Sequence, residues 1–105
     1  MDLPQINSKV VHRTTTGFCI YIDTLLDGSV PVERTTAGNP FVYPNREVAE
    51  RQIAEDVMDR ILEFLAGERD FEDAITIEEY VVEIDVLPDG STVDKSGSHF
   101  GKDSW

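Results

Sequence analysis

Apolar and polar residues alternate along two segments of the chain, residues 17–25 (GFCIYIDTL) and 77–87 (IEEYVVEIDVL). A period of two residues is typical of a β-strand that packs one face on a core. The β-prone segments 29–36 and 91–95 follow these two and predict shorter partner strands. Because Pro31 has no N–H to donate to a neighbouring strand, 29–36 is expected at an edge of the sheet.

The residues between Asn45 and Gly67 carry a helical pattern instead. Apolar side chains four residues apart form one row: Ala49, Ile53, Val57, Ile61 and Leu65. Side chains at this spacing are expected on one face of an α-helix, packed on the sheet. Asn45 is suited to accept a hydrogen bond from the first helical turn, and Gly67 is suited to end the helix.

The octet IDTLLDGS at residues 22–29 returns as IDVLPDGS at residues 84–91. Asp-Gly is a frequent pair in tight β-turns, so each octet is interpreted as the turn of a hairpin. A calcium-binding loop is the alternative, but both copies place a leucine, Leu25 and Leu87, where an EF-hand needs an oxygen ligand. The hairpin interpretation is favoured, and no metal site is predicted.

These elements predict an α+β fold, a four-stranded antiparallel sheet in ββαββ order with one long amphipathic helix packed on one face. Residues 1–95 are expected to form a single domain and residues 96–105 a flexible C-terminal tail. The sheet face toward the helix is expected to carry Phe18, Ile20, Ile22, Tyr80, Val82, Ile84 and Val86. The opposite face, with Tyr21 and Val81 among acidic residues, is expected to stay open.

The net charge of −12, from 21 acidic and 9 basic residues, narrows the functional classes. It disfavours direct binding to nucleic acids and to anionic membranes, which attract Lys and Arg, and it favours a basic protein partner. Cys19 is the only cysteine, so no intramolecular disulfide is expected. Because the amino terminus lacks the pattern of a signal peptide and no apolar run is long enough to span a membrane, a cytoplasmic location is expected.

Catalytic chemistry is not favoured by the sequence. His12 and His99 lie outside the well-patterned segments, and the glycines are scattered rather than gathered in a phosphate-binding loop. Cys19 is expected to be a half-buried apolar residue whose acidic surroundings raise its pKa. A non-enzymatic role without a cofactor is therefore predicted.

The negative charge is concentrated in residues 47–89, which hold fifteen acidic and three basic residues. On the helix, Glu55, Asp59 and Glu63 are spaced four residues apart and repel one another; we call them the acidic row. A second acidic group on the third strand is expected on the face opposite the helix: Glu79, Glu83 and Asp85. Like charges without visible compensation are candidates for function, so both groups are predicted to bind a partner.

These features predict a non-catalytic interaction module that binds a basic partner protein through its carboxylates. In the most specific form, it is an inhibitor whose carboxylates imitate nucleic-acid phosphates and occupy a nucleic-acid-binding cleft. A second interpretation is an accessory or structural subunit that forms a homodimer through the open sheet face, with Tyr21 and Val81 in the interface. A third is a small hydrolase or a divalent-metal binder.

Overall fold

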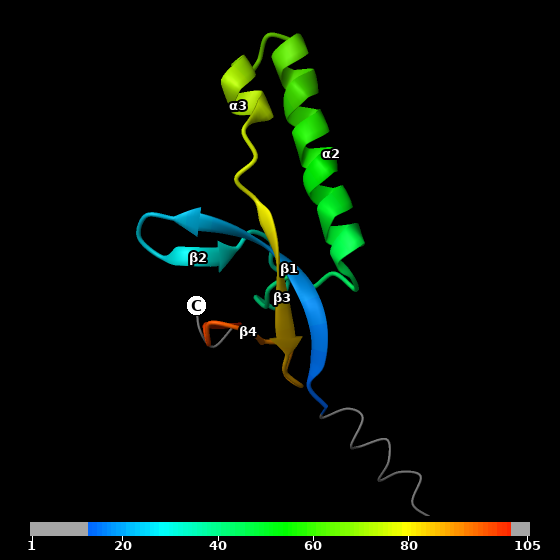
Figure 1. The fold of residues 1–105 in the computed structure, drawn as a ribbon, viewed down its shortest axis with the longest axis vertical. Coiled ribbons are helices and arrows are strands. Elements are labelled where there is room, and N and C mark those ends of the chain that lie inside the picture. Colours follow the sequence, from blue (N-terminus) through cyan, green and yellow to red (C-terminus); the bar gives the residue numbers. More distant parts are fainter. Residues whose placement is uncertain (1–12, 102–105) are drawn as a thin grey trace, which may run out of the picture.

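The computed structural model describes residues 13–101 and has an α+β fold, with a curled antiparallel sheet, one long helix and one short helix (Figure 1). Residues 1–12 and 102–105, and with them His12 and Trp105, lie outside the described part. The elements, in chain order, are β1 (Thr15–Thr24), β2 (Gly28–Pro31), α2 (Arg46–Leu65), α3 (Phe71–Ile75), β3 (Tyr80–Val86), β4 (Thr92–Asp94) and β5 (His99–Phe100).

The sheet has five strands in the order β2-β1-β3-β4-β5, and every neighbouring pair is antiparallel. The predicted four strands in ββαββ order are wrong in detail, since α3 and β5 are additional. Strand β5 comes from residues that were expected in the tail. The chain turns back into it at Asp94, whose Oδ1 accepts hydrogen bonds from the N–H groups of Ser96 and Ser98, both at 3.0 Å.

Both copies of the repeated octet form hairpin turns, as predicted. The first copy links β1 to β2, and the second links β3 to β4. The glycine of each copy has a positive φ, +70° at Gly28 and +90° at Gly90. Side chains other than glycine rarely adopt this conformation, so the Asp-Gly pairs place glycine where the turns require it.

Helix α2 has the predicted ends. The side-chain Oδ1 of Asn45 accepts a hydrogen bond from the N–H of Val48 at 2.9 Å, which caps the first turn. At the other end Ala66 is the C-cap, and Gly67 follows with a φ of +82°. Local capping residues therefore fix the length of this helix.

The buried side of α2 departs from the predicted apolar row in its second half. Ala49 is fully buried and Ile53 half-buried, but Ile61 and Leu65 are 37% and 71% exposed. Each step of four residues advances about 40° around an α-helix, so four such steps turn about 160°. The row that begins on the sheet side of the helix at Ala49 therefore ends on the solvent side at Leu65.

The pairing of β1 with β3 reverses the expected faces of β3. Ile20 lies opposite Val81, and Cys19 lies opposite Val82. Directly opposed residues of an antiparallel pair point to the same side, so Val81 shares the α2 side with Ile20. Val82 and Ile84 lie on the other side with Cys19. The predicted grouping is wrong for β3 because a change of one residue in register exchanges the two faces of a strand.

The sheet face away from α2 is covered rather than open. Cys19, Tyr21 and Ile84 are buried on it, each with at most 2% of its surface exposed. Val42 and Phe100 pack against them from neighbouring segments. Because the sheet curls through β4 and β5, the Phe100 ring meets the Tyr21 ring edge-on, with 5.8 Å between the ring centroids. The prediction that Tyr21 lies on an open face is therefore wrong.

Candidate functional site

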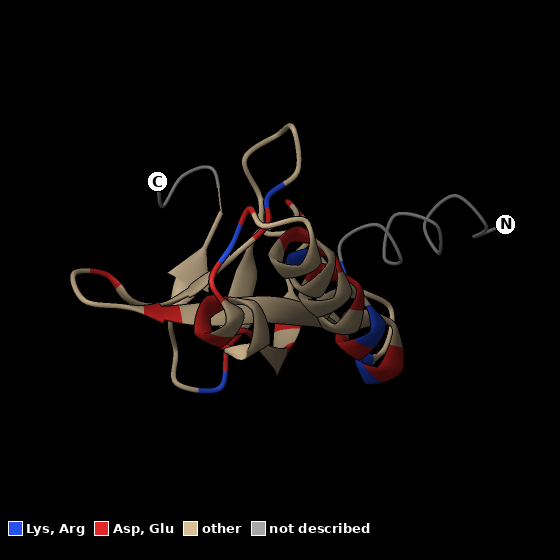
Figure 2. Cartoon of the chain, turned by 90° about the horizontal axis from the view of Figure 1, so that it is seen from above, with Lys and Arg blue, Asp and Glu red and all other residues tan. Residues whose placement is uncertain are grey.

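The basic residues of the acidic segment 47–89 are all in ion pairs, although acidic positions lie along both helices (Figure 2). The pairs are Arg51–Glu47, Arg60–Glu79, Arg69–Glu63 and Arg69–Asp73. Lys95, from outside the segment, adds a long pair with Glu83 at 3.8 Å. Of the fifteen carboxylates in this segment, which lies wholly within the described residues, five are in ion pairs and ten are in none.

The acidic row keeps two uncompensated members. Glu55 and Asp59 are exposed on α2, and no ion pair to either is present among residues 13–101. Glu63 differs, because its Oε1 accepts a hydrogen bond from Nε of Arg69 at 2.7 Å and forms an ion pair with Nη2 of the same guanidinium at 2.6 Å. The repulsion predicted along the row is therefore relieved at Glu63 and persists between Glu55 and Asp59.

The acidic group on β3 lies on the α2 side of the sheet, not opposite to it. The register shows this directly, since Glu83 is paired with Phe18, which packs under the helix. Glu79 and Glu83 are in the ion pairs described above, and the Glu79 side chain is only 14% exposed. Asp85 is exposed and has no ion pair within the described range. The predicted placement of this group is wrong, and Asp85 is its uncompensated member.

Tyr21 and Val81 do not share a surface. The Tyr21 hydroxyl donates a hydrogen bond to Oδ2 of Asp94 at 3.2 Å, and burial together with this carboxylate raises the pKa of Tyr21. Val81 is half-buried on the opposite side of the sheet, next to Ile20. A homodimer interface that uses both side chains on one open face is therefore inconsistent with the fold.

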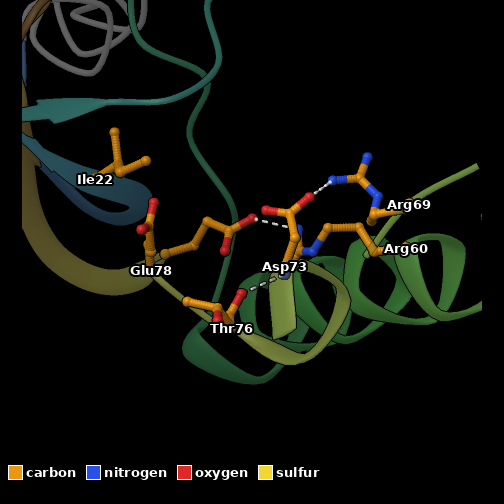
Figure 3. A pocket seen from close by; sticks show the side chains of 7 residues that line it. Ile22, Arg60, Arg69, Asp73, Thr76 and Glu78 are labelled. Carbon is orange, nitrogen blue, oxygen red and sulfur yellow. Dashed lines mark hydrogen bonds and ion pairs between the residues drawn. The ribbon is translucent and has the colours of Figure 1, made fainter. Parts of the chain in front are cut away.

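A pocket of about 250 Å³ lies where the two helices meet the start of β3 (Figure 3). Its lining comprises Ile22, Arg60, Arg69, Asp73, Thr76, Glu78 and Glu79. The Arg60 guanidinium joins the helix to the strand, since it pairs with Glu79 at 3.3 Å and donates to the carbonyl oxygen of Thr76 at 3.2 Å. Both arginines of the lining are thus in ion pairs, and the lining contains no Cys, His or Ser. The Arg60 contacts hold α2 against the segment that leads into β3, and no lining residue is an activated nucleophile.

Asp89, Ser91 and His99 form a short chain of hydrogen bonds at the end of the sheet. The Ser91 hydroxyl donates to Oδ1 of Asp89 at 2.6 Å, and its oxygen lies 3.1 Å from Nε2 of His99. In a Ser-His-Asp triad the histidine stands between the other two residues and accepts the serine proton. Here the serine stands between them and is 3% exposed. The arrangement orders the β3–β4 turn against β5 and does not activate Ser91.

Cys19 is also unsuited to nucleophilic chemistry. It is fully buried, and desolvation raises the pKa of its thiol to about 12. Because the thiolate is the reactive form, a raised pKa makes the residue inert. The direction of the predicted shift is confirmed, but its cause is burial in the sheet rather than acidic neighbours.

Exposed apolar side chains are the surface feature that the sequence analysis did not predict. On the second half of α2 they are Met58, Ile61, Leu62 and Leu65, and on the β1–β2 turn they are Leu25 and Leu26. The sequence does contain a signal for the first group, because Met58 and Leu62 are four residues apart beside the predicted row. Only the extent of the sheet, however, decides which apolar row stays uncovered.

Neither a metal-binding cluster nor a membrane-spanning helix is present among residues 13–101. No group of three or more His, Cys, Asp or Glu side chains in this range is arranged to hold a metal ion. Neither α2 nor α3 combines the length and the apolar composition that crossing a bilayer requires.

No protein-family model matches the chain, and neither a curated protein nor a solved structure matches it.

Proposed function

We propose that this protein is a non-catalytic interaction module that binds a basic surface of a partner protein through exposed carboxylates of α2. One observation carries the proposal: every basic residue of segment 47–89 is in an ion pair, yet ten of its carboxylates are in none with any residue that the structure describes. A fold that needed these charges only for its own contacts would pair them. Unpaired like charges at i, i+4 instead destabilise a helix by about 0.2–0.5 kcal/mol per pair.

The exposed carboxylates of Glu55 and Asp59 supply what a basic surface recognises. Each offers acceptor oxygens with a full negative charge, the combination that Arg and Lys bind in phosphates and in acidic peptides. A net charge of −12 also accelerates the encounter with a positively charged partner. The more specific form of the proposal is that this partner is a nucleic-acid-binding protein whose cleft the carboxylates occupy in place of phosphates. A cytoplasmic location is part of the same proposal.

The test compares two double variants that change the net charge equally. Glu55→Lys with Asp59→Lys reverses the uncompensated members of the acidic row. Asp27→Lys with Glu72→Lys reverses two exposed carboxylates that lie outside α2 and are in no ion pair within the described residues. Glu63 is left unchanged because Arg69 binds it.

Each tagged variant is used to capture proteins from native lysate, and the captured proteins are quantified at about 50 mM and about 500 mM NaCl. We expect the wild type and the Asp27/Glu72 variant to retain the same basic protein at low salt and to release it at high salt. The Glu55/Asp59 variant should not retain it. Equal capture by both double variants, or retention that does not depend on salt, contradicts the proposal.

A further inference from the structure

The second half of α2 exposes an apolar stripe, which we define as Met58, Ile61, Leu62 and Leu65. Their exposed fractions are 62%, 37%, 58% and 71% in that order. Isolated surface leucines are common in soluble proteins, but four large apolar residues side by side are not. The stripe is therefore a candidate for an interaction surface.

The stripe is continuous along the helix. At 3.6 residues per turn, Ala54, Met58, Ile61 and Leu65 fall within about 60° of arc, and Leu62 extends the apolar face by about 40°. The spacing from Ala54 to Leu65 alternates steps of four and three residues, which is the pattern of a seam between two packed helices. Ala54 is exposed as well. This spacing is typical of a helix that packs against a second helix.

The stripe is uncovered because α2 is longer than the part of the sheet beneath it. A helix of 20 residues is about 30 Å long, and its first half already packs Ala49 and Ile53 over the sheet. The second half continues beyond the strands, with α3 beside it (Figure 1). Helix α3 contacts it at another part of its circumference, where the Phe71 and Phe64 rings meet with 5.2 Å between their centroids. No strand or helix of the described residues covers the stripe.

The charges beside the stripe indicate what kind of helix fits. Glu55 and Asp59 follow Leu62 around the helix, and Glu50 lies on the other side of Ile61. Arg51 is the nearest cation on this side, and it is paired with Glu47. An apolar seam with acidic borders matches an amphipathic helix whose apolar face has basic borders.

The same charges disfavour the other occupants. Two copies of this chain would each bring a net charge of −12 and the same acidic borders to the interface. An anionic membrane surface would repel them in the same way.

We propose that the apolar stripe and its acidic borders bind one basic amphipathic helix of a partner protein. This inference rests on the proposed function and adds the structural class of the ligand and its place on α2. The carboxylates steer the partner and fix its orientation, and burial of the stripe supplies most of the affinity. Variants of the stripe should therefore act mainly on the dissociation rate, and variants of the borders mainly on the association rate.

The probe is a fluorescent peptide of about 18 residues made of Leu and Lys, with Leu at i, i+3, i+4 and i+7 so that it forms an amphipathic basic helix. Its control is a peptide of the same composition in an order that has no helical apolar face. Binding is followed by fluorescence anisotropy with the full-length protein. We expect the patterned peptide to bind at least about tenfold more tightly than the shuffled one.

Three variants locate the site. Met58→Ser with Leu62→Ser removes half of the stripe and should weaken binding of the patterned peptide at least about tenfold. Leu25→Ser with Leu26→Ser is the matched control, since it removes two leucines that are more exposed, at 103% and 95%, but lie on the β1–β2 turn. It should bind as the wild type does. Circular dichroism melting curves establish that each variant is folded.

The third variant, Glu55→Lys with Asp59→Lys, separates the two proposals. One outcome is that this variant weakens binding while the Met58/Leu62 variant binds like the wild type. The proposed function is then supported, and the proposal that the stripe binds a helix is overturned. If neither that variant nor salt changes the affinity, the proposed function itself fails. Equal binding of the two peptides also overturns the stripe. The proposal is also overturned if sedimentation shows a dimer that Met58→Ser with Leu62→Ser dissociates, because a second copy of the chain then covers the stripe.

Discussion

The two halves of α2 belong to one uninterrupted helix, and yet their apolar side chains have different surroundings. In the first half, the apolar residues Ala49 and Ile53 face the sheet, and the exposed Glu47 and Arg51 neutralise each other. In the second half, apolar residues such as Leu65 face solvent, and the exposed Asp59 is in no ion pair among residues 13–101. The first half is built for the stability of the fold. In the second half, apolar residues and a carboxylate contribute little to the stability of the fold, which is expected of residues that form a binding surface.

The same substitution should have very different effects on the sheet side of α2 and on the side that carries the apolar stripe. Ala49→Asp introduces a carboxylate at a fully buried position between Ile20 and Tyr43 and should lower the free energy of unfolding by about 3 kcal/mol or more. Ala54→Asp places the same side chain on the exposed side and should lower it by less than about 0.7 kcal/mol, the difference in helix propensity.

Denaturant unfolding followed by circular dichroism measures both variants. Because a domain of this size is stable by about 5–15 kcal/mol, Ala49→Asp should leave a large unfolded fraction or a strongly shifted midpoint. Similar midpoints for the two variants would show that Ala49 is not docked on the sheet, and the contrast between the buried and the exposed side of α2 would then be lost.

The features that could be predicted from the sequence are those that local residues determine. The ends of α2 follow from Asn45 and Gly67, and the two hairpin turns follow from their Asp-Gly pairs. Each of these signals acts within a few residues of the structure that it specifies.

The features that could not be predicted depend on distant contacts. Alternation places the residues of β3 on two faces but does not say which face joins Ile20; the register decides that, and it gives the α2 side to Val81. Strand β5 forms only because the turn at Asp94 returns the chain to β4. These pairings bring together residues that the sequence pattern treats one segment at a time.

The candidate site also has features that the sequence predicts and features that depend on distant contacts. The spacing of Glu55 and Asp59 predicts that they lie one turn apart on α2, and the structure places both on the exposed side. The ion pairs that remove Glu63 and Glu79 from the uncompensated set come from Arg69 and Arg60, which are six and nineteen residues away. No helical or strand period connects residues at those separations, so only the fold reveals which carboxylates stay unpaired.

Acid should destabilise the fold through Asp94, on strand β4. Burial raises the pKa of Asp94, but hydrogen bonds from Ser96, Ser98 and Tyr21 outweigh this and hold the pKa below its usual value. As the pH falls, the unfolded chain therefore binds the proton first. The stabilisation is complete above about pH 5 and is lost as the pH decreases through the unfolded value of about 3.9 toward the folded one.

Asp94→Asn should lower the free energy of unfolding at pH 7 by about 1 kcal/mol, after allowance for partial solvation, and should flatten its decline below about pH 5. Asp59→Asn is the matched control, since it removes one charge from an exposed residue of α2 that accepts no such hydrogen bonds among the described residues. It should keep the acid decline of the wild type. Urea unfolding at a series of pH values measures this, and equal slopes for Asp94→Asn and the wild type would contradict the role of the Asp94 network.

The smallest expected change in the free energy of unfolding comes from charge substitutions on α2, and its sign differs between the two halves of the helix. Asp59→Lys replaces repulsion with attraction toward Glu55, one turn away, and should raise the free energy of unfolding by about 0.5–1 kcal/mol at low salt. Arg51→Glu breaks the pair with Glu47 in the first half and should lower it by a similar amount. Both effects should shrink in 1 M NaCl, where screening acts over about 3 Å. If Asp59→Lys stabilises the fold and also weakens retention of the partner, the repulsion at this position is a cost that binding requires. A destabilised Asp59→Lys protein would mean that the carboxylate serves the fold, and the strongest reason for assigning α2 a partner would be lost.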